Sequence, residues 1–231
     1  MKLYAACALI DIEGTIGSIA FVRDVLFPYA AARIDRFVAE HAGEPPVRAV
    51  LDDAAGEAGV DPQDTGAVVA ALHAWSAADA KVTPLKTLQG MIWVEGFEAG
   101  EIRGDIYADA LAALRRFHEA GVRLYVYSSG SIAAQKLVFG HSIEGNLIPL
   151  FGGFFDTTIG PKLEASSYER IAEQIGEPPA RIVFFSDNPA ELDAARTAGM
   201  QTVQLARPED GVAAAFAHAA VANFDGIEIG V

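Results

Sequence analysis

The sequence predicts an α/β protein with a doubly wound, mainly parallel sheet and a helical segment inserted after the first strand. Short apolar runs alternate with helical patterns through the second half of the chain, which is typical of a parallel sheet covered by helices. The stretch from residue 18 to residue 104 interrupts this alternation with helical patterns and no convincing strand. A length of 231 residues suits one large domain, or a core with a smaller insert.

The first strand is expected to end at Leu9 and Ile10, directly before Asp11. The start of the chain resembles a lipoprotein signal, with one cysteine after a short apolar stretch. That stretch has only about four residues ahead of Cys7, whereas a signal peptide core needs about 7–15. We therefore interpret this segment as a strand and not as a leader.

The remaining strands and helices are predicted from continuous apolar runs that alternate with segments of helical spacing. Continuous apolar runs predict buried strands at residues 122–127, 153–156, 182–185 and 202–205. Apolar residues recur every three or four positions in the intervening segments, which is the helical period, and they predict helices at residues 106–119, 132–139, 164–175 and 189–198. Inside the insert, the same spacing predicts helices at residues 30–42 and 65–79.

We expect residues 1–17 and 105–231 to form the α/β core, and residues 18–104 to form a helical domain. Both crossings between the two parts lie at the carboxyl end of the first strand. Open α/β sheets bind their ligands at that end of the strands. The insert is therefore expected to act as a cap over an active site.

Composition and charge exclude several classes of function. The chain carries 17 Lys and Arg against 31 Asp and Glu, a net charge of −14, and no window clusters basic residues. Nucleic acids and anionic membranes are therefore not expected as partners. No apolar run approaches the length of a membrane span. The single cysteine excludes an internal disulfide and a cysteine-based zinc site, and it favours the reducing cytoplasm.

An acidic pair follows the first strand in the segment Asp11-Ile12-Glu13-Gly14-Thr15. Two acids at the carboxyl edge of the sheet stand where a metal-assisted nucleophile is needed. An ordinary turn is the alternative, because Asp often follows a strand and glycine supplies the bend.

Two further segments could hold a phosphate group. Ser128 and Ser129 follow the next predicted strand and precede a helix, and hydroxyl and N–H groups at a helix start bind phosphate. Lys162 is one of only five lysines and stands just before another helix. Taken alone, the serines could simply cap a helix and the lysine could be solvated. An acidic protein that handles phosphate nevertheless needs such a local positive charge.

The segment Ser186-Asp187-Asn188-Pro189-Ala190-Glu191 ends a later strand. Asn188 is expected to cap the next helix, Pro189 to occupy its first position, and Glu191 to complete a capping-box pattern. Asp187 is not explained by capping. Its carboxylate can face Asp11 across the edge of the sheet, and two carboxylates with a carbonyl oxygen make a site that suits Mg²⁺.

In this order the motifs resemble the haloacid dehalogenase superfamily of phosphohydrolases. Within it, the sequence resembles the enolase-phosphatases, also called acireductone synthases, essentially from end to end. Glu13 stands where most superfamily members have Asp. The resemblance also rests on FVRDVLFPY at 21–29, LQGMIW at 88–93 leading to residues 100–102, YSSGS at 127–131 and SDNPAELDAA at 186–195. Departures occur at Ile16-Gly17 and at Gly160-Pro161.

The resemblance implies a Mg²⁺-dependent enzyme of methionine salvage that enolises 2,3-diketo-5-methylthiopentyl-1-phosphate and then removes its phosphate, giving the acireductone. It implies Asp11 as the nucleophile, one Mg²⁺ held by Asp11, Asp187 and the backbone oxygen of Glu13, and a phosphate held by Ser128, Ser129 and Lys162. Glu13 would be the candidate acid and base. The methylthio tail would meet the cap, with Met91, Trp93 and Phe97 as apolar candidates, although packing inside the cap explains these three equally well.

Three other functions stay open on the sequence alone. The protein could be a Mg²⁺-dependent phosphatase of another small phosphate ester, because the core motifs report phosphoryl transfer and only the cap selects the substrate. It could be a catalytically silent binding protein, which the full set of acids argues against. It could be a haloacid dehalogenase, which needs no Mg²⁺ site. We expect a monomer.

Overall fold

The computed structural model describes residues 1–215 and 217–230, which form two compact units. One unit contains Met1–Phe21 and Arg103–Val231, and the other contains Val22–Ile102. The sequence placed the limits of the insert at residues 18 and 104.

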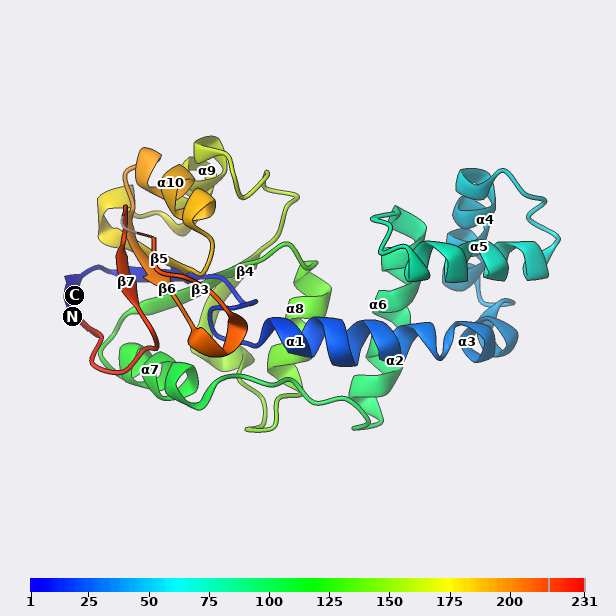
Figure 1. Ribbon diagram of the computed structural model, residues 1–231, viewed down its shortest axis with the longest axis horizontal. Coiled ribbons are helices and arrows are strands. Elements are labelled where there is room, and N and C mark those ends of the chain that lie inside the picture. The colour runs from blue at the N-terminus through cyan, green and yellow to red at the C-terminus, as the bar shows by residue number, and fades with distance from the viewer. Residues whose placement is uncertain (216, 231) are drawn as a thin grey trace. The chain divides into compact units, whose positions relative to one another are not determined.

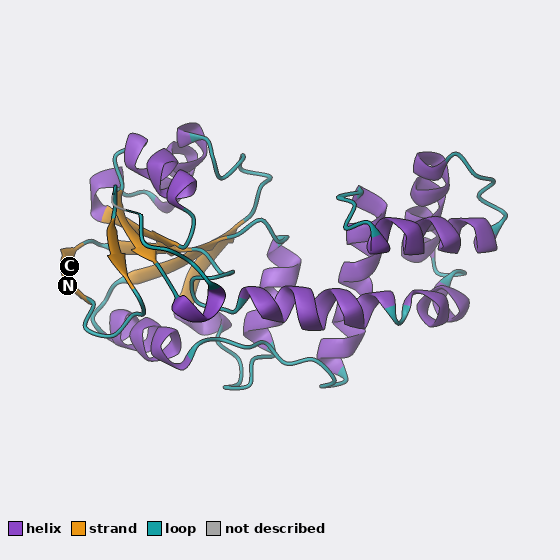
Figure 2. Cartoon of the chain, in the orientation of Figure 1, coloured by secondary structure: helices purple, strands orange, loops and turns teal. Residues whose placement is uncertain are grey.

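The first unit is built on a six-stranded sheet in which every neighbouring pair is parallel, in the order β4-β3-β2-β5-β6-β7. Its strands are β2 (Cys7–Ile10), β3 (Arg123–Tyr127), β4 (Phe151–Phe155), β5 (Ile182–Ser186), β6 (Gln201–Leu205) and β7 (Ala219–Val221). A separate parallel pair joins β1 (Lys2–Tyr4) to β8 (Glu228–Gly230). Figure 2 shows these strands in one unit only. The predicted doubly wound parallel sheet is confirmed.

The central strand β2 is apolar and fully buried, with a neighbouring strand on each edge and helices over both faces of the sheet. Leu9 pairs with Tyr125 of β3 on one side and with Phe184 of β5 on the other. The chain therefore leaves the carboxyl ends of β2, β3 and β5 side by side. Connections from these three strand ends run toward opposite sides of the sheet, which creates the crevice where such sheets bind ligands.

Helices cover both faces of this sheet: α7 (Ala108–Glu119), α8 (Ile132–Gly140), α9 (Ala165–Ile175) and α10 (Pro189–Thr197). Alternate strand residues face opposite ways, so Phe184 packs with Ile171 and Leu192 of α9 and α10. The next residue, Phe185, stacks on Phe117 of α7 with ring centroids 6.4 Å apart. Figure 1 shows α9 and α10 on one side of the sheet and α7 on the other.

Several boundaries differ from the sequence expectations. The predicted strand 153–156 begins at Phe151, and the predicted helix 106–119 begins at Ala108. The predicted helix 30–42 is interrupted, because α2 (Phe27–Ala31) ends before α3 (Ile34–His41) begins. The strand predicted at the start of the chain is divided into β1 and β2, and strands β7 and β8 were not predicted. Strands β1, β7 and β8 have three residues each, which is too short to display a period of two.

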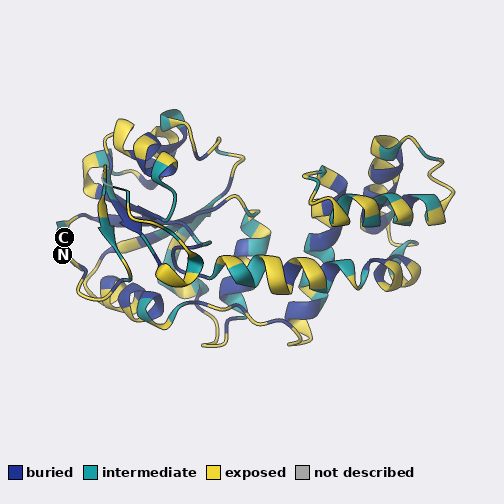
Figure 3. Ribbon diagram, viewed as in Figure 1, coloured by how far each residue is buried: buried dark blue, intermediate teal, exposed yellow. Residues whose placement is uncertain are grey.

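The second unit is helical throughout residues 22–102. After α1 (Ile19–Phe21), which belongs to the first unit, it contains a π-helical turn (Val22–Leu26), α2, α3, α4 (Pro45–Ala58), α5 (Thr65–Ala77) and α6 (Thr83–Glu98). Apolar residues of these helices, among them Ile34, Leu51, Leu72 and Leu88, form a core of their own. Figure 3 shows the buried stripes along these helices beside exposed outer surfaces. Among the described residues, no helix has the length and apolar character that crossing a membrane requires.

Candidate active site

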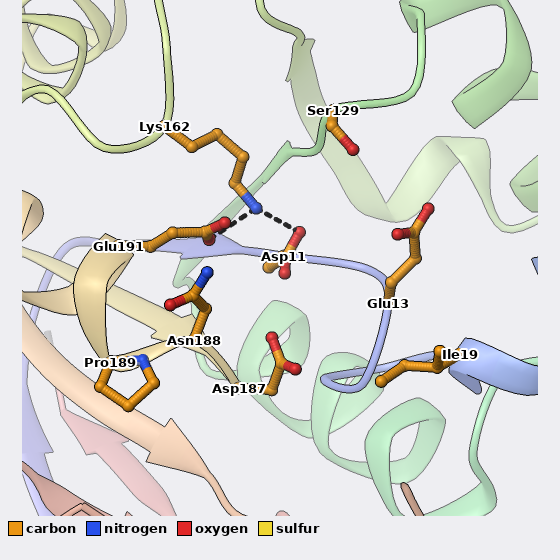
Figure 4. A pocket seen from close by; sticks show the side chains of 9 residues that line it. All are labelled: Asp11, Glu13, Ile19, Ser129, Lys162, Asp187, Asn188, Pro189 and Glu191. Atoms are coloured by element: carbon orange, nitrogen blue, oxygen red, sulfur yellow. Dashed lines mark ion pairs between the residues drawn. The ribbon is translucent and has the colours of Figure 1, made fainter. Parts of the chain in front are cut away.

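A cavity of about 440 Å³ opens at the carboxyl ends of the strands in the α/β unit. Its lining gathers residues that are distant in the sequence, and Figure 4 shows their side chains around Asp11. The lining residues are Asp11, Glu13, Ile19, Ser129, Lys162, Asp187, Asn188, Pro189 and Glu191. All the predicted site residues except Ser128 therefore contribute to one cavity.

Asp11 is fixed by the end of the sheet and by the tight loop that follows it. Its N–H donates to the Phe185 carbonyl oxygen (2.9 Å), which continues the pairing of β2 with β5. The loop then turns on the Ile12 carbonyl, which accepts from the N–H groups of Ile16 (3.0 Å) and Gly17 (2.8 Å). Asp11 is buried, with only 5% of its surface exposed. The loop directs Glu13 into the same cavity.

Lys162 reaches the cavity from the loop before α9 and joins two carboxylates. Its Nζ lies 2.7 Å from Asp11 Oδ1 and 2.6 Å from Glu191 Oε2. The lysine is buried, so the interaction is screened far less than a surface ion pair. An ammonium has three N–H donors. These two contacts leave one donor for a ligand in the cavity.

Glu191 corrects one sequence expectation. Asn188 does cap α10, because its side-chain oxygen accepts from the Ala190 N–H. Glu191 does not complete a capping box. Its carboxylate instead pairs with Lys162 and accepts from the Ser186 hydroxyl (3.0 Å), while the Asn188 N–H donates to that hydroxyl (3.1 Å). The residue is buried and lies within the site, where the sequence analysis did not place it.

Asp187 follows β5 and packs directly against the loop after β2. Its N–H donates to the Thr15 hydroxyl oxygen (3.0 Å). Gly14 lies beside its carboxylate, and a Cβ atom at Gly14 would fall 2.6 Å from Asp187 Oδ2. Gly14 also has φ +69°, a conformation that residues with a Cβ atom rarely adopt. The glycine is therefore required both by the turn and by this close approach.

The two serines take different places. Ser129 is exposed and lines the cavity, whereas Ser128 is buried and its hydroxyl accepts from the Gly130 N–H (3.2 Å). The start of α8 offers fewer N–H groups than the sequence suggested. Ile132 donates its N–H to Asp156 (3.0 Å) and Ala134 donates to Ser131 (3.2 Å). These two groups are already satisfied within the protein.

Four acids and one cation share the cavity, and their pKa values reflect this imbalance. Burial, followed by the negative charge of Asp11, raises the pKa of Asp187 to about 6. The same two causes raise the pKa of Glu13 and of Glu191, against the attraction of Lys162. Burial by itself would lower the pKa of Lys162, but the charges of Asp11 and Glu191 reverse this and raise it. The site is therefore short of positive charge.

These donors fit Mg²⁺. Burial and then the charge of Asp11 raise the pKa of Asp187, and a divalent cation would favour the charged form of both carboxylates. All the available donors are oxygens, which Mg²⁺ prefers. Among the described residues there is no group of three or more His, Cys, Asp or Glu side chains suited to hold a metal. A cation here would therefore need backbone oxygen, water or ligand atoms to complete its coordination.

The candidate tail-binding residues lie in the helical unit, and each packs there. Phe97 is buried. Trp93 donates its Nε1–H to the Leu26 carbonyl oxygen (2.8 Å), and its ring lies 6.1 Å from that of Phe27. Met91 and Trp93 are half-buried against the apolar core of the unit. Packing therefore accounts for the contacts of these residues that the structure describes.

Comparisons with known proteins show which family the chain resembles. Residues 6–199 match the sequence model of the haloacid dehalogenase-like hydrolase family. Enolase-phosphatase E1 of Pseudomonas aeruginosa (strain UCBPP-PA14) is 56% identical over 199 residues, covering 86% of this chain and 88% of the relative. The protein of the same name from Azotobacter vinelandii is 52% identical over 223 residues, covering 95% and 96%. The crystal structure of the Saccharomyces cerevisiae UTR4 protein is similar with a TM-score of 0.82 and 33% identity, covering 96% and 99%.

Proposed function

The chain belongs to the haloacid dehalogenase-like hydrolases and, within them, to the enolase-phosphatases, and we propose that it catalyses both steps of the reaction named for that family. The substrate is 2,3-diketo-5-methylthiopentyl-1-phosphate. Enolisation followed by loss of phosphate gives the acireductone of methionine salvage. One observation carries the proposal: Asp11 lies at the end of the central strand, in one cavity with Lys162 and Asp187.

Asp11 is the nucleophile of the phosphatase step in this proposal. One of its oxygens forms a bond to phosphorus while the bond between phosphorus and the substrate oxygen breaks, which gives an aspartyl phosphate. Water then attacks the phosphorus, and the bond to Asp11 breaks to release inorganic phosphate. A covalent intermediate of this kind divides one difficult hydrolysis into two easier steps. The Lys162 ammonium at 2.7 Å fixes the orientation of the Asp11 carboxylate.

The phosphate group is assigned to Lys162, Ser128 and Ser129. Lys162 provides the positive charge that an acidic protein needs in order to receive a dianion. Ser129 lines the cavity and can donate its hydroxyl to the phosphate directly. Ser128 is buried, and its hydroxyl accepts from the Gly130 N–H. Ser128 therefore also stabilises the conformation of the loop between β3 and α8.

One Mg²⁺ is assigned to the carboxylates of Asp11 and Asp187 and to the backbone oxygen of Glu13. When bound, it would neutralise the repulsion between the phosphate and these carboxylates and would polarise the diketone oxygens. The close packing of Gly14 on Asp187 supports this assignment, because it holds the loop of Asp11 against the second carboxylate.

Glu13 is assigned the proton chemistry. Its carboxyl lines the cavity beside Asp11 and can take a proton from the substrate carbon or give one to the departing oxygen. Glu13→Gln keeps the backbone oxygen and removes the carboxyl group that can take up or release a proton. We expect it to retain Mg²⁺ binding and to lose at least one of the two steps, followed separately as enol absorbance and phosphate release. Parent rates for both steps would move the base elsewhere.

The helical unit is assigned as a cap that selects the substrate, with Met91, Trp93 and Phe97 as candidates to meet the methylthio tail. We propose that the protein works as a monomer in the cytoplasm. The experiment that tests the whole proposal follows the diketone phosphate by ultraviolet absorbance with and without Mg²⁺, beside a panel of sugar phosphates. Faster hydrolysis of a sugar phosphate than of the diketone would favour a monofunctional phosphatase instead.

A further inference from the structure

The backbone of Asp187 is held at both of its ends. Its N–H donates to the Thr15 hydroxyl oxygen, and its carbonyl accepts from Gln204 Nε2, each at 3.0 Å. Gln204 is fully buried at the carboxyl end of β6. Its Nε2 also donates to the Ala213 carbonyl (3.0 Å), and its Oε1 accepts from the Ala215 N–H (2.7 Å). The side chain therefore connects Asp187 to the segment after β6.

Arg207 holds the other partner in this contact. Its Nε donates to the Thr15 carbonyl oxygen at 2.8 Å, while its terminal nitrogens form a fork with Asp109 at 2.8 and 3.1 Å. Only 1% of the arginine surface is exposed. The guanidinium lies 4.0 Å from the centre of the Tyr107 ring. Asp109 also accepts a hydrogen bond from the Phe224 N–H (2.9 Å). It therefore anchors the outer end of the Arg207 side chain.

Together these contacts form a continuous series of hydrogen bonds, here called the bracket, that joins the loop after β2 to the loop after β5. Arg207 binds Thr15, Thr15 binds Asp187, and Asp187 binds Gln204. The loop that Thr15 belongs to carries Asp11 and Glu13. The match to the hydrolase family ends at residue 199, so both outer members of the bracket come from the segment that follows it.

We propose that Gln204 and Arg207 are positioning residues, which fix the distance between the Asp11 loop and Asp187 and thereby shape the oxygen site between them. The proposal rests on the proposed function for the identity of the ion. A site of this kind must hold its donors within about 0.5 Å of the working geometry. Backbone contacts that orient the donors commonly change metal affinity or activity by about 10–100-fold when they are lost.

Gln204→Leu tests the contact between Gln204 and Asp187, and the chain offers a matched control on the same strand. Gln201 also donates through its Nε2 to two carbonyl oxygens, those of Tyr4 (2.6 Å) and Ala180 (2.9 Å), but at the opposite end of β6. We expect Gln204→Leu to weaken Mg²⁺ binding by about tenfold or more and to lower kcat for an aryl phosphate more than it changes KM. We expect Gln201→Leu to bind Mg²⁺ as the parent does.

Arg207→Lys tests the contact between Arg207 and Thr15, and Asp109→Asn is its control. A lysine cannot reach Thr15 and Asp109 together, because it lacks the guanidinium fork. Asp109→Asn removes the ionic outer anchor but leaves the Nε bond to Thr15. We expect both variants to unfold at lower denaturant concentration, and we expect only Arg207→Lys to weaken Mg²⁺ binding.

Amide hydrogen exchange on the metal-free proteins separates this inference from the proposed function. Faster exchange at Asp187 in Gln204→Leu, with parent exchange there in Gln201→Leu, supports positioning whether or not phosphate is released. Equal effects of the two glutamine variants on exchange and on Mg²⁺ binding would overturn it, as would parent values in Gln204→Leu. A parent protein that neither binds Mg²⁺ nor releases phosphate would refute the proposed function, and the exchange result would still decide whether these residues hold Asp187.

Discussion

Replacing Lys162 by methionine removes the cation that lies between Asp11 and Glu191, at 2.7 and 2.6 Å. The apolar side chain keeps most of the volume, so packing should change little. Without Mg²⁺, the buried carboxylates must then repel each other or take up a proton. Breaking a buried ion pair by removing one partner costs about 3–5 kcal/mol.

The loss in free energy of unfolding should depend on pH, and the direction of this dependence follows from the pKa values of the buried carboxyl groups. Loss of the lysine raises the pKa of Glu191 further above the ordinary value of 4.5. A carboxyl with a raised pKa in the folded state contributes its full stability below the ordinary value, and that stability is lost as pH rises through the folded value. The lysine itself stays protonated across this range, because its neighbours raise its pKa. In the parent the pKa of Glu191 is already raised to about 7, so the stabilities of the two proteins diverge only above that pH, by about 1.4 kcal/mol for each further pH unit.

Urea unfolding in EDTA, measured at intervals from about pH 6 to about pH 9, tests this reasoning. The difference in free energy of unfolding between Lys162→Met and the parent should be constant below about pH 7 and grow at higher pH by about 1.4 kcal/mol per pH unit. Lys136→Met is the matched control, because Lys136 is exposed. A loss of stability in Lys162→Met that does not change with pH would refute the electrostatic account.

Three further predictions follow from the site. Asp11→Asn should abolish phosphate release without unfolding the protein, since an amide is a poor nucleophile; turnover within about tenfold of the parent, or about 1.4 kcal/mol of barrier, would contradict the role of Asp11. Gly14→Ala should weaken Mg²⁺ binding, measured by calorimetry, because the new Cβ would lie 2.6 Å from Asp187 Oδ2. Gly59→Ala is the control, because Gly59 has φ +68° and open space around it. It should lose only the backbone cost of about 1–2 kcal/mol in the free energy of unfolding. Mg²⁺ affinity should fall about tenfold per pH unit below about pH 6, because the raised pKa of Asp187 makes a proton compete with the ion; an affinity that is the same on both sides of that pH would place the ion elsewhere.

Much of the site could be predicted from the sequence because it follows the strand ends. Asp11 and Ser128 come directly after an apolar run and Asp187 follows another by one residue, and the parallel alternation requires those runs to end at one edge of the sheet. Continuous apolar runs and a period of three to four residues both report the burial of local segments. They are therefore sufficient to indicate a sheet, its covering helices and the side at which polar residues gather.

The partners of these residues were decided only by the tertiary structure. Glu191 fits a helix cap when only its neighbours are considered, yet packing of α10 against β5 turns it toward Lys162. The contacts of Gln204 with Asp187 and of Arg207 with Thr15 have no sequence signature, because both are made to backbone carbonyl oxygens. A backbone carbonyl is present at every residue, so no pattern of side chains can reveal which one a buried donor will meet. That choice depends on how the segment after β6 folds back onto the two loops, and it arises only when the sheet is assembled.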